Sequence, residues 1–185
     1  MKSLICENKV KLGMDGSNIK ISFTGKINEE NVRTFINDIK NMLERKTESK
    51  SLTICISSSG GSVDIAIELF YFLKLLDCEI MTINTSYVNS AAIIIFAAGT
   101  ERVSLPYSSF YVHSITKNLN GDFTADDLLR ETIEIQATTD KVAGILADVS
   151  NKNKSYWKRL IKRGKLLTPQ KAIDLGLVNR ILKYE

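Results

Sequence analysis

Short runs of β-branched residues alternate along this chain with segments of helical periodicity, and this alternation leaves few possible folds. Residues 18–24 (NIKISFT) alternate apolar and polar side chains as a strand does, and apolar residues then recur at helical spacing from Asn28 to about Lys46. Two further strand–helix pairs follow, at 51–57 with 65–76 and at 79–85 with 89–98. Strands alternating with helices predict βαβ units, so we expect an α/β fold with a mainly parallel sheet.

The second half of the chain contains a long predicted helix over residues 124–149. It begins with Thr124 as an N-cap, and Asp126 and Asp127 lie in its first turn, where carboxylates interact favourably with the helix dipole. The other predicted elements are strands at 101–105 and 109–113, a basic helix at 155–163, a short helix from Pro169 to Gly176, and a strand at 177–182.

Length and composition indicate one domain over residues 1–185, in which residues 1–17 form a short N-terminal segment. The longest apolar run, Ala91 to Ala98, is much shorter than the roughly 20 residues of a membrane helix. The first 16 residues carry charges throughout and lack the apolar centre of a signal peptide. We therefore expect no membrane contact and a cytoplasmic location.

The three cysteines, Cys6, Cys55 and Cys78, form no CxxC pair, and the chain has one histidine to join them in a metal site. An odd, scattered set is typical of a reducing compartment, so we expect no disulfide framework, and we predict neither a metal nor another cofactor. Cys55 and Cys78 lie inside apolar segments, and we interpret both as buried small hydrophobic residues.

Much of the positive charge is concentrated in residues 151–165, which carry seven Lys or Arg and no acid. Such a stretch is found in nucleic-acid-binding patches and also on the solvated face of amphipathic helices. Only one aromatic pair, Tyr156 and Trp157, is present to stack on bases. We favour the solvated face and expect no nucleic-acid partner.

Two residues that follow predicted strands have the chemistry of a nucleophile and its base. Ser90 follows the strand 79–85 and opens a segment of small residues, so its surroundings leave room for a substrate carbonyl. The same serine is also a plausible N-cap of the following helix. His113 ends the strand 109–113, and as the only histidine it is the only source of an imidazole base; a purely structural role is the alternative.

Gly60 and Gly61 follow another predicted strand, within the turn SSGG. Adjacent glycines permit positive φ angles and let a substrate backbone approach the chain closely. This suits an oxyanion hole or a groove for an extended peptide, and it also suits a plain turn. Neither GxxxxGK[ST] nor GxGxxG occurs in the chain, so a phosphate-binding loop is not indicated.

Four segments, taken in order, resemble the proteolytic subunit of the Clp protease, a member of the crotonase-like superfamily. ICISSSGGSV is similar to the family's INSPGGSV, and TINTSYVNSAAIIIFAAGT to the segment around its nucleophile. RVSLPYSSFYVHS resembles the ALPNS…HQP segment with the basic histidine, and KLLTPQKAIDLGLVNRIL the closing FLSAPEAVEYGLVD segment. The resemblance extends from about residue 18 to 182.

This resemblance implies specific roles for residues of the chain. Ser90 matches the nucleophile and His113 the general base of a serine endopeptidase, while Gly61 and Ala91 match the oxyanion hole. The expected substrate groove contains Gly60, Ser62 and Val63.

The resemblance also implies a fold and an assembly. The fold would be a crotonase-like core of ββα units, with helix 124–149 as a protruding handle. The handle would join two heptameric rings into a chamber of fourteen subunits. Unfolded polypeptides would be the substrates, delivered by a Clp-type ring ATPase.

The chain departs from the family pattern at three points. Gly164 occupies the position of the triad aspartate, and its neighbours are basic, so Ser90 and His113 would act as a dyad or use another acceptor for the imidazole, such as Asp148, Asn151 or a backbone carbonyl. Ser59 replaces the proline before the glycine pair. The segment before the first strand is about 17 residues, shorter than the family's gating loop and first helix, which weakens the prediction of an ATPase partner.

Two alternatives therefore stand beside an active peptidase. The first is a catalytically degenerate subunit that serves assembly or regulation, which the glycine at position 164 favours. The second is another crotonase-superfamily protein, such as an acyl-CoA enzyme or a protein similar to signal-peptide peptidases. The pairing of Ser90 with His113 argues against the acyl-CoA enzyme.

Overall fold

The computed structural model describes residues 18–45 and 51–182, which form alternating strands and helices. The strands are β1 (Asn18–Ile27), β2 (Ser51–Gly61), β3 (Glu79–Asn89), β4 (Glu101–Ser104), β5 (Ser109–Val112), β6 (Lys165–Leu167) and β7 (Arg180–Ile181). The helices are α1 (Glu29–Arg45), α2 (Val63–Lys74), α3 (Ala92–Ala97), α4 (Ala125–Asp148), α5 (Lys154–Arg163) and α6 (Pro169–Asp174).

The sheet is mainly parallel, as the sequence predicts. Its strands follow the order β1-β2-β3-β4-β7, and each neighbouring pair in this order is parallel. β3 pairs with β4 along its first part and with β5 along its last residues, Tyr87 to Asn89. β5 in turn pairs antiparallel with β6. The carboxyl end of β3 is therefore enclosed by a small antiparallel corner formed by β5 and β6.

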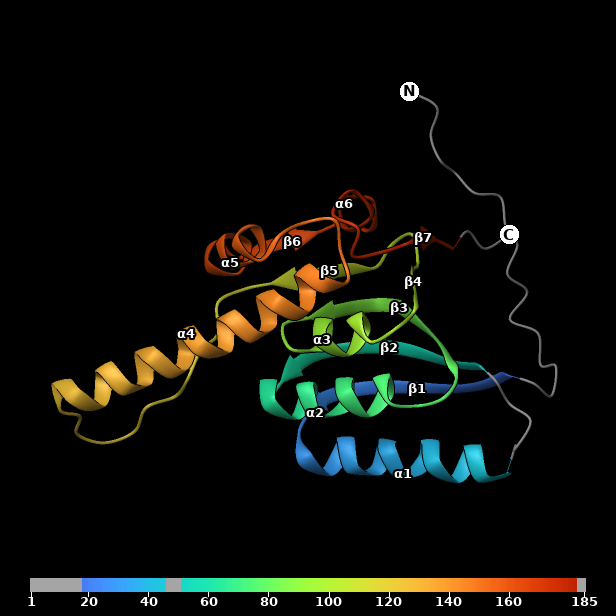
Figure 1. Ribbon diagram of the computed structural model, residues 1–185, viewed down its shortest axis with the longest axis horizontal. Helices are drawn as coiled ribbons and strands as arrows, with labels where there is room; N and C mark the ends of the chain where they lie inside the picture. The colour runs from blue at the N-terminus through green and yellow to red at the C-terminus, as the bar shows by residue number, and fades with distance from the viewer. Residues whose placement is uncertain (1–17, 46–50, 183–185) are drawn as a thin grey trace.

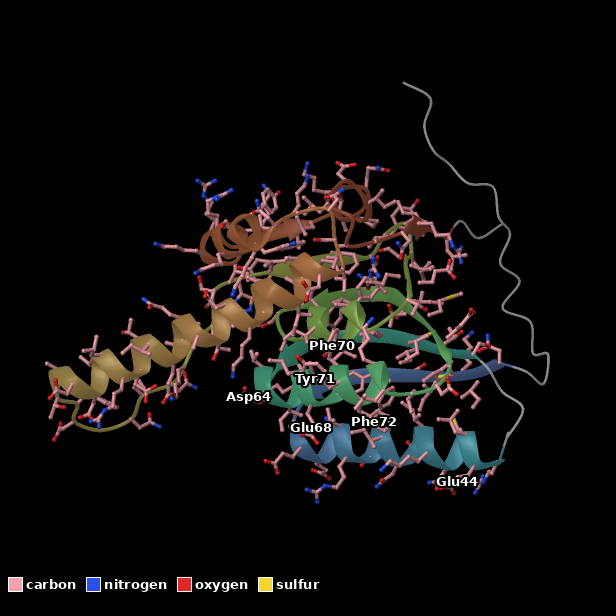
Figure 2. The ribbon with its side chains drawn as sticks, in the orientation of Figure 1. Glu44, Asp64, Glu68, Phe70, Tyr71 and Phe72 are labelled. Atoms are coloured by element: carbon pink, nitrogen blue, oxygen red, sulfur yellow. The ribbon has the colours of Figure 1, made fainter. Side chains whose placement is uncertain are left out.

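The helices pack on the sheet in successive contacts (Figure 1). α1 packs against β1 and α2, α2 packs against α3, and α3 packs against β2 and β3. Phe23 of β1 meets Phe35 of α1 edge to face, with ring centroids 5.0 Å apart. Phe72 of α2 lies toward α1, where the Lys40 ammonium is 5.8 Å from its ring centroid (Figure 2). Every residue of α3 is buried, as its run of small and apolar side chains predicts.

α4 extends away from the rest of the protein as a handle (Figure 1). Thr124 caps it as predicted: its hydroxyl accepts from Asp127 N–H, and the Asp127 carboxylate accepts from Thr124 N–H, which completes a capping box. The buried residues of the helix lie in its C-terminal part, at Val142, Ala143, Ile145 and Leu146. In the N-terminal part the apolar side chains of Leu128, Leu129 and Ile133 are exposed.

Several predicted boundaries are wrong, and the largest correction concerns the glycine pair. β2 continues through Gly60 and Gly61, which pair with Lys26 and Ile27 of β1, so these glycines lie in a strand and not in a turn. An irregularity in the ladder after Thr24 shifts the register and accommodates their unusual backbone angles. β3 likewise extends beyond its predicted end to Asn89, because β5 continues to pair with it.

The end of the chain also differs from the prediction. The sequence analysis missed β6, because three residues are too few to show periodicity and only the pairing with β5 makes them a strand. The closing strand is two residues, Arg180 and Ile181, and is shorter than predicted.

Arg102 of β4 connects the last third of the chain to the sheet. Its buried guanidinium donates to four carbonyl oxygens: Gly99, Val149, Gly176 and Leu177. Burial lowers the pKa of this guanidinium. Gly99 lies just before β4, and the other three carbonyls come from the end of α4 and from the segment between α6 and β7, so one side chain ties these segments to β4.

The basic segment around α5 forms an amphipathic helix. Trp157 is fully buried and donates its indole N–H to the Ser150 hydroxyl at 2.8 Å, so its ring is not accessible for stacking on bases. Lys154 and Lys158 bind Asp140 of α4 instead, at 3.5 and 2.6 Å. Part of the positive charge of α5 therefore connects this helix to α4.

The predicted burial of the cysteines needs a correction. Cys55 and Cys78 are half-buried, and each packs against apolar side chains. Burial raises the pKa of both thiols. Cys6 lies outside the described residues. Within the described ranges, no helix has both the length and the apolar character required to cross a membrane.

Candidate active site

Ser90 occupies a strained turn between β3 and α3. Its φ angle is 55°, and among the described residues it is the only one other than glycine with a positive φ. Such a backbone costs about 1–3 kcal/mol for a side-chain-bearing residue and is concentrated at functional sites. Ser90 N–H donates to Tyr111 O at 2.7 Å, which fixes the turn to β5. The helix N-cap is Ala91, without a side-chain cap, so the interpretation of Ser90 as the N-cap is wrong.

Gly60 lies directly against this turn. A Cβ atom added to Gly60 would stand 2.7 Å from Ser90 Cβ, 2.8 Å from Asn89 O and 3.1 Å from Ala91 N, and the φ angle of Gly60 is 92°. No side chain fits between the two strands at this point. The missing side chain therefore allows the serine turn to pack closely on β2.

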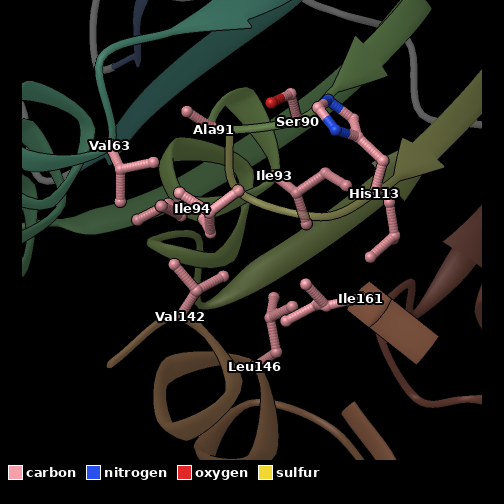
Figure 3. A pocket seen from close by; sticks show the side chains of 11 residues that line it. Val63, Ser90, Ala91, Ile93, Ile94, His113, Val142, Leu146 and Ile161 are labelled. Atoms are coloured by element: carbon pink, nitrogen blue, oxygen red, sulfur yellow. The ribbon is translucent and has the colours of Figure 1, made fainter. Parts of the chain in front are cut away.

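The ladder between β3 and β5 sets the distance between Ser90 and His113 along the sheet. Asn89 pairs with Tyr111, so Ser90 is one residue beyond the last pair on β3 and His113 is two residues beyond it on β5. Both side chains line the same pocket, and Figure 3 shows them together at one end of it. The Ser90 hydroxyl points away from the imidazole in that view. Among the described hydrogen bonds, none joins the two side chains.

The imidazole of His113 has two contacts with its own segment of chain. Nδ1 lies 2.8 Å from Ser114 O, and the ring stacks on Tyr111 with centroids 5.1 Å apart and planes 26° from parallel. A carbonyl oxygen only accepts hydrogen bonds, so this contact places the proton on Nδ1 and leaves Nε2 as an acceptor. Ser114 is anchored in turn, because its hydroxyl lies 3.3 Å from Ile161 O and 3.2 Å from Lys162 O at the end of α5.

The pocket beside these two residues is apolar. Apart from Ser90 and His113 its lining consists of aliphatic side chains from four helices, β5 and the segment after it: Val63, Ala91, Ile93, Ile94, Val112, Ile115, Val142, Leu146 and Ile161. The space between these side chains, about 350 Å³, is continuous with open solvent.

Gly164 lies next to His113, where the resemblance places a carboxylate. In the antiparallel ladder Val112 pairs with Lys165, so the next position on β5 faces Gly164. Gly164 has a φ angle of 67° and ends α5 by donating to Leu160 O. A glycine at this position supplies no acceptor side chain.

The three suggested replacements for that carboxylate differ in what they contact. Asn151 donates its side-chain amide to Asp174 O, so it is engaged with α6. No described hydrogen bond joins Asp148 to His113. The backbone carbonyl of Ser114 is the group that meets the imidazole, which corresponds to the third suggestion.

The other predicted site residues surround the serine turn. Ala91 is buried immediately after Ser90, and Gly61 pairs with Ile27 in the ladder between β1 and β2. Ser62 caps α2 by accepting from Ile65 N–H, and Val63 begins this helix and lines the pocket. All four therefore lie on the segments that border Ser90. Ser59 is exposed on β2, one residue before the glycine pair.

The sequence analysis did not predict the contacts that Tyr111 and Ser114 make with His113. The only signal for Tyr111 is its place two residues before His113, since alternate residues of a strand share one face. The carbonyl of Ser114 leaves no signal at all, because every residue has one.

The fold and the site together define a class: an α/β protein with a serine and an imidazole at the carboxyl ends of neighbouring parallel strands. The Clp protease family profile matches residues 14–185. The chain therefore belongs to the Clp protease family, as the sequence resemblance predicts, and this membership supports a protease function.

Relatives of the chain carry the same family name. The ATP-dependent Clp protease proteolytic subunit of Ligilactobacillus salivarius is 26% identical over 165 residues, which cover 88% of this chain and 82% of that protein. Proteolytic subunit 1 of Tropheryma whipplei is 27% identical over 143 residues, 76% of this chain and 69% of the relative. Proteolytic subunit 2 of Mycobacterium tuberculosis is 26% identical over 147 residues, 77% and 68% of the two chains.

Proposed function

We propose that this chain is a serine endopeptidase subunit in which Ser90 is the nucleophile and His113 the general base. The observation that carries the proposal is the pairing of Asn89 with Tyr111, which brings the ends of β3 and β5 together at one pocket. The strained backbone of Ser90 adds support, because a tight turn presents a serine hydroxyl at the end of a strand.

The proposed reaction begins with a rotation of the Ser90 hydroxyl toward the imidazole. Oγ then attacks the carbonyl carbon of a peptide bond while its proton passes to His113 Nε2. Ser114 O holds the proton on Nδ1 throughout. When the tetrahedral intermediate collapses, the C–N bond breaks and the leaving amine takes the proton from Nε2; water then hydrolyses the acyl-enzyme by the same proton transfers.

The oxyanion of this intermediate would bind the N–H groups of Gly61 and Ala91. Ala91 follows the nucleophile directly, as in other serine turns of this kind. For Gly61, the ladder with β1 uses the next amide, Ser62 N–H, which donates to Ile27 O at 3.0 Å. Successive N–H groups of a strand point to opposite sides, so the Gly61 amide is directed away from β1.

The proposed substrate is an unfolded polypeptide bound in an extended form. Gly60, Ser62 and Val63 lie on the segment beside the nucleophile, and the extended peptide would run along this segment. The aliphatic pocket at Val142, Leu146 and Ile161 would receive an apolar side chain next to the scissile bond.

We further propose that the subunit acts in a multimeric chamber in the cytoplasm. The outer part of α4 exposes Leu128, Leu129 and Ile133, which are 47, 58 and 56% accessible. Such a row of apolar side chains is typical of a surface covered by another subunit. Heptameric rings, paired into a tetradecamer and served by a ring ATPase, are the assembly that the family resemblance implies.

The test of the catalytic proposal is covalent labelling with a fluorophosphonate probe. The wild-type protein should be labelled at Ser90, and both Ser90→Ala and His113→Ala should lose the label and the cleavage of an unfolded protein. An assembled wild-type protein that takes no label would instead identify a degenerate subunit. Hydrolysis of an acyl-CoA ester without peptide cleavage would identify another crotonase-type enzyme.

The test of the assembly is the mass of the particle in solution. Leu129→Asp and Ile133→Asp should reduce the assembly to smaller units, while Leu75→Asp, on a residue 84% exposed at the end of α2, should leave its mass unchanged. A wild-type chain that is monomeric at micromolar concentration would contradict the chamber.

A further inference from the structure

The side chain of Tyr111 is placed to control the plane of the His113 ring. His113 directly follows β5, two positions after Tyr111, so the two side chains lie on the same face of the chain. Their rings stack at 5.1 Å with planes 26° apart, and Tyr111 is 41% exposed, so its ring is not engaged in the core. A stacked aromatic neighbour restricts rotation of the imidazole about its Cβ–Cγ bond.

The Ser114 peptide is placed to control the tautomer of the same ring. Its carbonyl oxygen accepts from His113 Nδ1 at 2.8 Å. The peptide is itself held, because the Ser114 hydroxyl reaches the carbonyls of Ile161 and Lys162 at the end of α5. The acceptor of the imidazole proton is therefore connected to a helix packed against the core.

Gly164 leaves space beside the hydroxyl group of Tyr111. A Cβ atom at position 164 would stand 3.7 Å from the Tyr111 hydroxyl oxygen, so the tyrosine borders the volume that a side chain at this position would enter. The φ angle of 67° makes glycine the favoured residue there. Among the described residues, no carboxylate is hydrogen-bonded to His113.

We propose that Tyr111 and the Ser114 peptide are the positioning elements of the His113 base, and that together they orient it without a carboxylate. A base that accepts the proton of a nucleophile needs a third group that fixes its tautomer and orientation. Here the carbonyl fixes the tautomer and the tyrosine ring fixes the plane. This inference rests on the proposed peptidase function and adds to it the means of orienting the base.

The single histidine makes the positioning directly observable. In protein labelled with ¹⁵N-histidine, every imidazole signal belongs to His113, and nitrogen chemical shifts distinguish the Nδ1–H from the Nε2–H tautomer. At a pH where the ring is neutral, the wild-type protein should show the Nδ1–H form. Tyr111→Leu should show a mixture of both forms, because the ring then rotates away from Ser114 O, and Tyr111→Phe should resemble the wild type.

Labelling rates with the fluorophosphonate probe provide the second measurement. Loss of the stacked ring should slow labelling of Tyr111→Leu by about 10- to 100-fold, the cost of a small misplacement of a catalytic group. Tyr111→Phe keeps the ring and should stay within about threefold of the wild type. Tyr107→Leu is the matched control, since Tyr107 is 91% exposed outside the pocket lining. Tyr111→Gln replaces the leucine variant if thermal unfolding shows that the latter is not folded.

The outcomes separate this inference from the function on which it rests. If the wild type is labelled and Tyr111→Leu is labelled as fast with an unchanged tautomer, the positioning role is wrong while the peptidase stands. Equal losses in the leucine and phenylalanine variants would also overturn the role of the stacked ring. If the wild type takes no label, the proposed function fails, and the tautomer of Tyr111→Leu still decides the inference.

Discussion

The two sides of the candidate site are built in different ways. Ser90 is held through the backbone by a positive φ angle, by the hydrogen bond that its N–H donates to Tyr111 O, and by Gly60 packed against its Cβ atom. His113 is held by one carbonyl contact and one stacked ring near the surface. The serine side therefore has little freedom to adjust, while the histidine side tolerates small changes, and substitutions on the two sides should differ in their effects.

The largest effect is expected for Gly60→Ala. The new methyl group would overlap Ser90 Cβ and Asn89 O, both under 3 Å away, and the turn would have to move. We expect labelling to fall by about 100-fold and the free energy of unfolding by about 1–3 kcal/mol. Gly25→Ala is the matched control, because Gly25 has nearly the same φ angle, 91°, with nothing within 4 Å of its Cβ position. Equal losses in both variants would show that backbone strain, and not the contact with Ser90, is responsible.

A smaller effect is expected for Ser114→Ala on the histidine side. This change removes the hydroxyl that reaches Ile161 O and Lys162 O, and the Ser114 carbonyl then holds the imidazole less firmly. The loss of a hydrogen bond worth about 1 kcal/mol should reduce kcat by about 5-fold with little change in KM. Peptide hydrolysis by the wild type, Ser114→Ala and Ser114→Thr measures it, and the threonine variant should retain most of the activity. A change confined to KM would contradict a positioning role.

Gly164→Ala should affect stability more than activity. Its φ angle of 67° strains any side chain, but the added methyl group would stand at ordinary contact distance from Tyr111. We expect a loss of about 1 kcal/mol, which lowers Tm by about 2–4 °C in a chain of this size, and a labelling rate within about threefold of the wild type. Gly144→Ala, in a helix with open space around it, should instead raise Tm. A large loss of labelling in Gly164→Ala would mean that the histidine side is as rigid as the serine side.

The smallest effect is expected for Lys117→Gln, in the segment that follows His113. Lys117 binds Glu131 and Glu134 of α4, and these contacts raise the pKa of its ammonium and lower the pKa of the Glu134 carboxyl. Because the pKa of Glu134 is lower in the folded state, its carboxylate stabilises the fold at pH values above the pKa of the unfolded state. This stabilisation is lost as the pH falls through the pKa of the folded state. At neutral pH the loss of these exposed ion pairs in Lys117→Gln should change the labelling rate by less than about twofold.

Added salt should act on the wild type in the same direction as Lys117→Gln, because it screens exposed charges. Labelling rates of the wild type at low and high salt therefore check whether the effect of Lys117→Gln comes from the loss of its ion pairs. A tenfold effect at neutral pH would show that this segment, and not Ser114 alone, holds the base.

Many of the elements followed from local patterns. The capping box at Thr124 and the buried apolar residues of α3 could be predicted, because each depends on residues that are close in sequence. The extension of β2 through Gly60 and the presence of β6 could not be predicted, because glycines and a three-residue segment show no alternation of apolar and polar side chains. Both are strands only because a neighbouring strand pairs with them.

The sequence by itself determined the α/β class, the family resemblance, and the candidate pair Ser90 and His113, since strand ends and rare residue types are visible in one dimension. Only the tertiary structure decided what surrounds that pair: Gly60 against the serine, and Tyr111 and the Ser114 carbonyl against the imidazole. The physical reason is that these contacts depend on strand register and on backbone atoms. Register is set by pairing across the sheet, and backbone atoms are the same in every residue.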